Sequence, residues 1–143
     1  MTPEVHIALL HYPVLNKAGE IVATAVTNLD IHDNARSART FRCASYHLVT
    51  PLDAQVELVS RILGHWRDGF GARRVPNRVD AINLVRVSRD VDSMIEAVQG
   101  NRPERPVLIA TAARRLRKTA AHAELRARMA DDPGPYILVF GTG

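Results

Sequence analysis

The sequence contains a single cysteine, Cys43, among 143 residues. One thiol cannot form a disulfide within the chain, and such a composition suits a reducing compartment. No apolar run is long enough to cross a membrane, and no basic segment precedes the first apolar run, so we predict neither a transmembrane helix nor a signal peptide. These absences indicate a cytoplasmic protein, and the length predicts one domain over residues 1–143 with its own core.

Metal-ligand patterns are also missing. No two of the six histidines are four residues apart, and none is adjacent to Cys43. A closed zinc site needs four ligands, so we predict no metal. Cys43 has no local signature of a nucleophile and is interpreted as a buried structural thiol. His6 and His47 fall within strand-like runs and are interpreted as packed side chains.

Lysine is scarce as well, because 17 of the 19 basic residues are arginine. A G+C-rich coding sequence accounts for that ratio. The placement of the charges is more informative: residues 101–143 hold eight basic and four acidic side chains, whereas residues 1–60 hold four basic and six acidic ones. This clustering of positive charge toward the C-terminus indicates an anionic partner.

Short apolar runs alternate with amphipathic segments along the whole chain. The runs are nearly continuous and lie near residues 5–10, 46–50, 84–88, 106–111 and 136–140. Runs of this kind, bounded by proline or glycine, are typical of strands buried on both faces. The segments with helical periodicity cover residues 29–41, 53–66, 91–98 and 119–129. The alternation predicts a three-layer α/β fold, with a mostly parallel sheet covered by helices on both faces.

Some local features refine this prediction. Asp53 is placed to cap the helix that follows it, and Gly100 to end the helix before it. Residues 14–20 are expected to form a turn. We expect residues 69–77 to be a mobile stretch.

The densest polar cluster lies between residues 27 and 40, at an expected junction of strand and helix. Arg36 and Arg39 are three residues apart, so both project from one helix face. Polar groups at such a junction often form a ligand site. A helix capped by Asp30 or Asp33 and facing solvent explains the same residues equally well. Chemistry alone leaves both interpretations open.

The C-terminal sequence Gly141-Thr142-Gly143 matches half of a dinucleotide-binding fingerprint. No helix follows to offer its N-terminus to a phosphate, so the spacing by itself favours a simple turn.

Several motifs along the chain together resemble those of one known protein family. The longest block runs from His11-Tyr12-Pro13 through residues 24–33 (TAVTNLDIHD) to Ala38-Arg39-Thr40. Shorter matches follow at residues 49–51, 65–66, 84–87, 110–114 and 140–143. This series, which covers essentially the whole chain, resembles a small bacterial family of SPOUT RNA methyltransferases.

The resemblance implies an α/β fold with a C-terminal trefoil knot that binds S-adenosylmethionine, usually in dimers. It implies that Asn34 and Arg39 match the first SPOUT motif, with Arg39 near the reacting nucleotide and Asn34 holding the loop. The residues that match the two cofactor-binding loops are Ala110, Thr111, Ala112, Phe140, Gly141, Thr142 and Gly143. The candidate contacts to the RNA backbone are Arg36, Arg114, Arg115, Arg117 and Lys118. For the run from Arg114 to Lys118, the start of a solvated helix is an equal alternative.

Members of this family continue past the glycine turn with a loop and a final helix that complete the knot and the cofactor pocket. We expect this chain to lack that segment and to have an incomplete knot. The functional prediction is a methyltransferase core that acts on structured RNA, either tRNA or rRNA. The alternatives are a non-catalytic RNA-binding or assembly module and an unrelated α/β domain that binds a small molecule.

Overall fold

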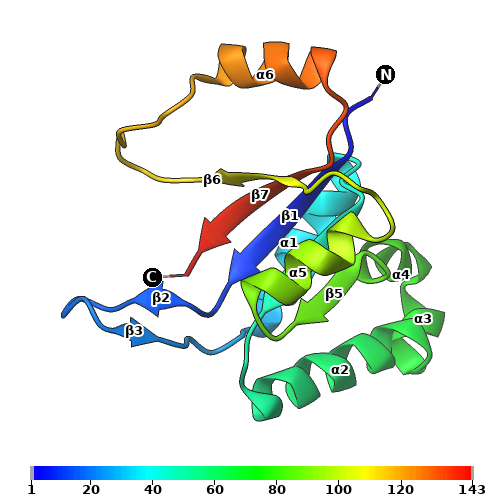
Figure 1. The fold of residues 1–143 in the computed structure, drawn as a ribbon. Helices are drawn as coiled ribbons and strands as arrows, with labels where there is room; N and C mark the ends of the chain where they lie inside the picture. Colours follow the sequence, from blue (N-terminus) through cyan, green and yellow to red (C-terminus); the bar gives the residue numbers. More distant parts are fainter. Residues whose placement is uncertain (1, 143) are drawn as a thin grey trace.

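The computed structural model describes residues 2–142 and shows a five-stranded sheet flanked by helices (Figure 1). All neighbouring strands are parallel, in the order β5-β4-β1-β7-β6. The strands are β1 (Val5–Leu10), β4 (Ser45–Val49), β5 (Val85–Ser88), β6 (Val107–Ala110) and β7 (Tyr136–Gly141). Each apolar run named above forms one of these strands, so the prediction of an α/β fold with a parallel sheet is confirmed.

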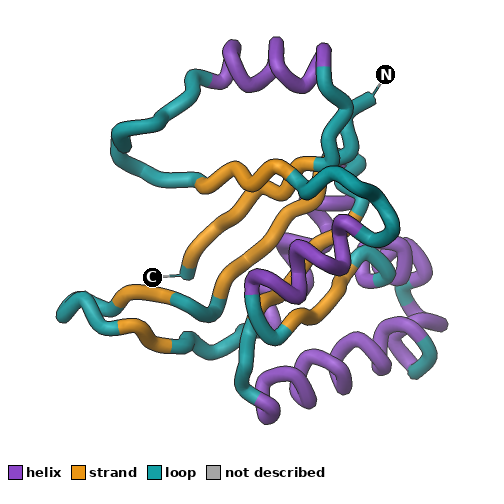
Figure 2. Tube along the Cα trace, in the orientation of Figure 1, coloured by secondary structure: helices purple, strands orange, loops and turns teal. Residues whose placement is uncertain are grey.

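The helices and a small hairpin fill the connections between these strands (Figure 2). The helices are α1 (Asn28–Thr40), α2 (Asp53–Arg67), α3 (Phe70–Arg74), α4 (Pro76–Ile82), α5 (Val91–Gln99) and α6 (His122–Asp131). The expected turn at residues 14–20 connects β2 (Val14–Leu15) to β3 (Ile21–Val22), which pair antiparallel. The stretch at residues 69–77, expected to be mobile, carries α3 and the start of α4.

Alternate residues of β4 face two separate cores. Tyr46 and Leu48 are fully buried on the side covered by α1, α2 and α4, where they join Ile31 of α1. Val49 points to the opposite side and packs with Met94 of α5. The predicted three layers are therefore present, and burial of these apolar side chains is the main term that stabilises the fold.

The helix ends explain why the elements begin and stop where they do. Thr27 caps α1: its hydroxyl accepts a hydrogen bond from the Asp30 backbone N–H at 3.1 Å, and the Asp30 carboxylate accepts one from the Thr27 N–H at 2.8 Å. This reciprocal arrangement is a capping box. The prediction that Asp53 caps α2 is wrong, because Asp53 lies in the first turn and Leu52 precedes it without a side-chain hydrogen bond. Gly100 ends α5 with φ of 56°, as predicted.

Helix α6 lies apart from the sheet (Figure 1). It has no buried residue, and Leu125 and Met129, expected to form its apolar face, are only half-buried. On the neighbouring strand β6, Leu108 is 41% exposed. The apolar side of α6 is therefore only partly covered within residues 2–142.

Two general features bear on the class of protein. No helix within residues 2–142 is both long and apolar enough to span a membrane. In the same part of the chain, no group of three or more histidine, cysteine or acidic side chains is arranged to hold a metal ion. Cys43 is half-buried against the α1 core, and burial raises the pKa of its thiol, so it is a poor nucleophile at neutral pH.

Candidate functional site at the carboxyl edge of the sheet

Parallel strands bring their carboxyl ends to one edge of a sheet, and ligands of α/β proteins bind there. Strand β7 lies between β1 and β6, so the segments that follow these three strands are neighbours. The Thr111 N–H donates to the Val139 carbonyl at 3.0 Å, which holds residues 110–112 against the end of β7. Two of the segments expected to bind the cofactor, residues 110–112 and 140–142, therefore lie side by side. Gly143 lies outside the described residues.

A chain of hydrogen bonds connects three polar side chains at this edge. The Thr142 hydroxyl donates to the Leu10 carbonyl at 3.0 Å. Since that bond uses its proton, the hydrogen bond between Thr24 and Thr142, 2.5 Å between the two Oγ1 atoms, requires Thr24 to donate. In this arrangement Thr24 accepts from His11 Nδ1 at 3.0 Å, and the longer contact of the Thr24 hydroxyl with the His11 carbonyl, at 3.4 Å, is not used. The hydrogen-bond pattern thus places the imidazole proton of His11 on Nδ1.

The other ring nitrogen of His11 is a buried acceptor without a proton. The side chain is 1% exposed, and Nε2 has no hydrogen-bond partner. The nearest charge is the Asp30 carboxylate, 3.7 Å away. Burial lowers the pKa of His11, and the Asp30 charge opposes that shift only in part. The imidazole is therefore neutral at neutral pH, so its free nitrogen is available to accept a proton, and the Asp30 carboxylate can stabilise the imidazolium that forms.

Asn34 lies one turn after Asp30 and supports it. Its side-chain amide donates to the Asp30 carbonyl at 2.9 Å, and the Tyr46 hydroxyl donates to the same oxygen at 2.8 Å. Asn34 therefore fixes the first turn of α1. In this geometry it positions the carboxylate next to His11.

Arg39 lies at the other end of α1. At 1.5 Å per residue, it is roughly 18 Å along the helix axis from the Thr27 cap. Its guanidinium is exposed and lies 3.9 Å from the Asp80 carboxylate of α4. Arg36 is also exposed, 3.8 Å from Asp33. The structure therefore gathers His11, Asp30 and the two loops at one edge, and leaves Arg39 away from them.

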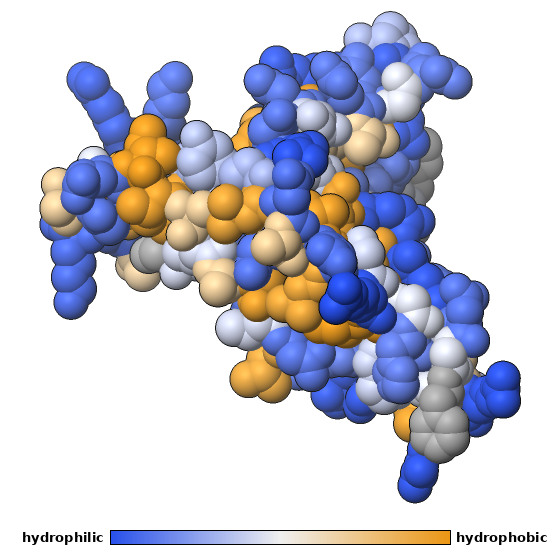
Figure 3. Space-filling model, turned by 90° about the horizontal axis from the view of Figure 1, so that it is seen from below, coloured by the Kyte–Doolittle hydropathy of each residue, from blue (hydrophilic) through white to orange (hydrophobic). Residues whose placement is uncertain are grey.

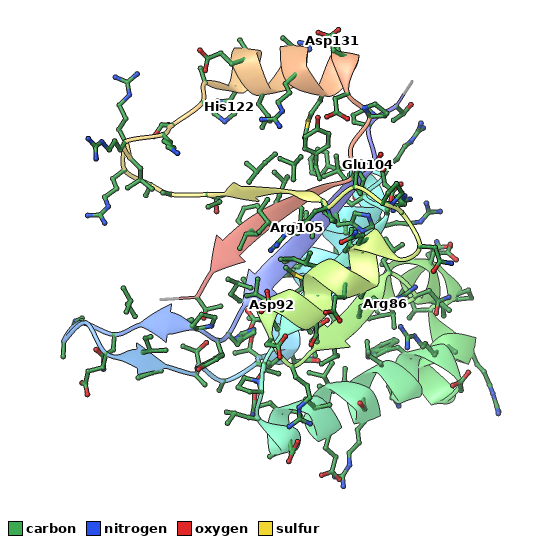
Figure 4. All side chains as sticks on the ribbon, in the orientation of Figure 1. Arg86, Asp92, Glu104, Arg105, His122 and Asp131 are labelled. Atoms are coloured by element: carbon green, nitrogen blue, oxygen red, sulfur yellow. The ribbon has the colours of Figure 1, made fainter. Side chains whose placement is uncertain are left out.

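The basic run from Arg114 to Lys118 lies in the exposed loop between β6 and α6 (Figure 4). The alternative that this run starts a helix is wrong, because α6 begins at His122. The guanidinium groups of Arg114, Arg115 and Arg117 form no salt bridge within residues 2–142. This loop is therefore free to contact a partner with negative charge.

His11 and Thr24 were not predicted as site residues from the sequence. One signal was available: His11 follows a continuous apolar run, so it lies at the carboxyl end of a strand. No local pattern connects His11 to Thr24, or Thr24 to Thr142, because these contacts span 13 and 118 residues along the chain.

The carboxyl edge fits one wall of a site for S-adenosylmethionine. A Cβ added to Gly141 would meet no atom within 4 Å, so the turn is open on the ligand side. The loops at residues 110–112 and 140–142 carry no charged side chain. They offer main-chain groups, which suit the neutral adenosyl part of the cofactor. The buried Nε2 of His11 lacks a donor, as expected where a ligand or substrate completes the pairing.

Comparison with known proteins shows the family. The model of a family described as "SAM-dependent RNA methyltransferase" matches residues 4–143. The chain therefore belongs to the SAM-dependent RNA methyltransferase family, whose cofactor is S-adenosylmethionine.

Individual relatives are similar over nearly all of this chain. It is 37% identical over 139 residues to an uncharacterized protein of Aquifex aeolicus, a match that covers 97% of this chain and 68% of that protein. It is 39% identical to a tRNA (guanine-N(1)-)-methyltransferase of Oleidesulfovibrio alaskensis and 38% identical to one of Nitratidesulfovibrio vulgaris. These two matches cover 94% and 95% of this chain but only 31% of each relative. The activity in those two names thus describes proteins about three times as long.

Proposed function

We propose that this chain methylates a nucleotide of structured RNA with S-adenosylmethionine as the methyl donor, and that His11 accepts the proton which the target atom loses. The observation that carries the proposal is the buried Nε2 of His11, without a hydrogen-bond partner, on a side chain that Thr24 connects to Thr142 at the carboxyl edge. We take tRNA as the first candidate substrate, because two relatives are named as tRNA methyltransferases. We favour guanine N1 as the target for the same reason, with rRNA as the other candidate.

The residues that would hold the cofactor are those of the two loops: Ala110, Thr111, Ala112, Phe140, Gly141, Thr142 and Gly143. When bound, S-adenosylmethionine supplies an electrophilic methyl group. A ring nitrogen such as guanine N1 carries a proton, which must leave as the nitrogen is methylated. His11 Nε2 accepts it, and the Asp30 carboxylate at 3.7 Å stabilises the imidazolium that results.

Thr24 and Asn34 position these two groups. Thr24 holds the proton of His11 on Nδ1, which keeps Nε2 available as the acceptor. Asn34 holds the first turn of α1, from which Asp30 projects. In this proposal Asn34 acts through Asp30 and does not contact the nucleotide.

Two separate basic surfaces support RNA binding. Arg36 and Arg39 project from the exposed face of α1, and Arg114, Arg115, Arg117 and Lys118 extend from the loop after β6. We propose that both contact phosphates. Arg39 then acts on RNA that runs along α1, because its distance from His11 does not suit contact with the same reacting base.

The test compares His11→Gln with a matched control, His122→Gln, at an exposed position of α6. Loss of a general base costs about 10²–10⁴-fold in rate. We expect His11→Gln to lose methyl transfer to tRNA on this scale and to keep cofactor affinity, measured by calorimetry, within a few-fold. His122→Gln should retain full activity. Full activity of a folded His11→Gln variant would refute the role of this histidine.

A non-catalytic RNA-binding module is the second candidate, favoured by the exposed basic loop after β6. It predicts RNA binding without methyl transfer by any form of the protein that contains residues 1–143. An assay of methyl transfer to RNA that is bound stoichiometrically separates the two candidates.

We further propose that residues 1–143 fold as one unit in the cytoplasm and act as a homodimer. Apolar side chains that remain exposed near the carboxyl edge support pairing: Leu108 and Phe140 are each 41% exposed. Figure 3 shows apolar surface in the middle of one face and again on the protruding part at its left. Sedimentation velocity should show a dimer that Leu108→Asp weakens. A monomer at all concentrations would contradict the proposal.

A further inference from the structure

A second polar site lies at the opposite edge of the sheet, beneath the C-terminal end of α5. Four side chains form one continuous chain of hydrogen bonds there. The Glu4 carboxylate lies 2.9 Å from His6 Nε2, and His6 Nδ1 lies 2.6 Å from the Ser45 hydroxyl. The same hydroxyl lies 2.7 Å from His47 Nε2. Such a chain does not serve packing alone, because apolar side chains would fill this layer without the need for paired polar groups.

The chain of hydrogen bonds fixes where each proton lies when the imidazoles are neutral. The Glu4 carboxylate can only accept, so the His6 proton is on Nε2 and His6 Nδ1 accepts from Ser45. The Ser45 hydroxyl must then accept from His47 Nε2. His47 Nδ1 is left as a bare acceptor, although His47 is only 3% exposed and Nδ1 has no partner. The end of the chain therefore requires a hydrogen-bond donor that the described residues do not supply.

His47 lines a cavity of about 420 Å³ between the sheet and α5. The cavity extends from the buried end of the chain at His47 to exposed residues, Arg86 on the edge strand β5 and Ala97 on α5. Figure 4 labels Arg86 on this side of the molecule. The volume falls in the range of small-ligand sites, and His47 forms part of the lining, with its Nδ1 buried at the base.

The charges around the cavity favour an anion. The two protons on Nη1 of Arg86 are used by the carbonyls of Asn83 at 2.6 Å and Val85 at 3.0 Å, which leaves Nε and Nη2 as free donors. Arg86 has no carboxylate partner within residues 2–142. Glu4, the one acidic residue that lines the cavity, is already paired with Arg102 at 2.7 Å and with His6. The positive charge of Arg86 is thus uncompensated.

We propose that this cavity is a second binding site, separate from the methyl-transfer site, for a phosphate group that carries a proton. The anionic oxygens accept from the Arg86 guanidinium, and the P–OH group donates to His47 Nδ1. A monoprotonated phosphate is the oxyanion that offers both functions at once, whereas sulfate has only acceptors at neutral pH. The phosphate can be the free ion, or it can be the terminal phosphate of an RNA in its singly protonated form, which is present below and around the second pKa of about 6.

The depth of the site has an electrostatic consequence. Burial, with His6 and Arg86 adding positive charge, lowers the pKa of His47 to about 4. His47 is therefore neutral at physiological pH. Its Nδ1 accepts a hydrogen bond from the protonated ligand, and the side chain adds no charge to the site. The other charged groups that face the cavity are Glu4, Arg86 and Arg102.

The experiment titrates the full chain with inorganic phosphate and with sulfate at constant ionic strength, followed by heteronuclear NMR. We expect saturable shifts at Ser88, Ala97 and Val98, together with a change at His47 Nδ1. Sulfate should bind at least tenfold more weakly, because it leaves His47 Nδ1 without a donor. No saturable change, or equal binding of the two anions, would overturn the proposal.

Three variants assign the binding to the cavity. Arg86→Gln should weaken phosphate binding at least tenfold, and Arg86→Lys should restore it to within a few-fold because it keeps the charge. The matched control is Arg89→Gln, since Arg89 is exposed and paired with Asp53 outside the cavity. Affinity that is unchanged in a folded Arg86→Gln variant would also overturn the proposal.

The two sources of phosphate are distinguished with short RNAs. Each titration gives an affinity. If a 5′-phosphorylated oligonucleotide binds at least tenfold more tightly than its 5′-hydroxyl form and at least tenfold more tightly than inorganic phosphate, the ligand is an RNA terminus. If it binds no more tightly than inorganic phosphate, the ligand is the free ion.

Discussion

Thr24 and Thr142 are 118 residues apart in the chain, yet their hydroxyl oxygens lie 2.5 Å from each other. The bond joins the connection that leads into α1 to the end of the last strand of the sheet. The same bond orients the Thr24 hydroxyl so that its oxygen can accept a hydrogen bond from His11 Nδ1. The orientation of the proposed base thus depends on a contact between the segment before α1 and the end of β7.

Thr24→Val should impair methyl transfer more than it impairs stability. Valine has a similar shape but cannot accept from His11, so the imidazole proton is no longer held on Nδ1. The lost hydrogen bond should lower the free energy of unfolding by about 1 kcal/mol. The methyl-transfer rate should fall at least tenfold, with the optimum pH altered. An unchanged pH–rate profile would mean that Thr24 is only structural.

The stability of the protein should decrease as the pH falls from about 6.5 to 4. His47 has a folded-state pKa of about 4, below the ordinary value of 6.5, so the unfolded chain binds a proton in this range that the folded chain does not. Full stability is present above the unfolded pKa, and roughly 3 kcal/mol is lost by pH 4. The pKa values of His11 and His32 are also lowered, mainly by burial, and act in the same direction.

Urea unfolding at several pH values measures this effect. His47→Gln should reduce the slope of unfolding free energy against pH by about one proton. His122→Gln, at an exposed position, should leave the slope unchanged. If both variants behave as the wild type does, His47 is not a source of the pH dependence.

RNA binding should weaken steeply as salt is added. Each phosphate that is neutralised contributes about −0.7 to −0.9 to the slope of log affinity against log salt. Replacement of Arg114, Arg115 and Arg117 together by alanine should make the slope shallower by a few units. Filter binding at a series of salt concentrations measures it. An unchanged slope would show that this loop does not contact the backbone.

The cap of α1 should contribute measurably to stability. Thr27→Ala removes the side-chain acceptor for the Asp30 N–H and should cost about 1 kcal/mol. The appropriate control is Thr2→Ala, at an exposed position before β1. Because the cap also sets the direction of Asp30, methyl transfer should fall further than stability predicts. A loss of stability without any further loss of activity would show that the cap does not orient Asp30 for methyl transfer.

Alone, the sequence determined the elements and the class of fold. Apolar periodicity is local, so the runs at residues 5–10 and 107–110 could be identified as strands, and their continuity indicated burial on both faces. The location of the loops at residues 110–112 and 140–142 at one edge was also predictable, since both follow parallel strands, whereas the sheet order that makes them neighbours was not. The resemblance to SPOUT methyltransferases added the family, which the comparisons confirm.

Only the tertiary structure decided which polar side chains meet. Arg39 shares a helix with Asp30, but α1 runs antiparallel to the strands and carries Arg39 away from the carboxyl edge. The register of β1 against β4 places His6 opposite Ser45 and so creates the buried chain to His47. The physical reason is the same in both cases. Periodicity fixes the face on which a residue lies, whereas a hydrogen bond between distant segments depends on sheet order, strand register and helix direction.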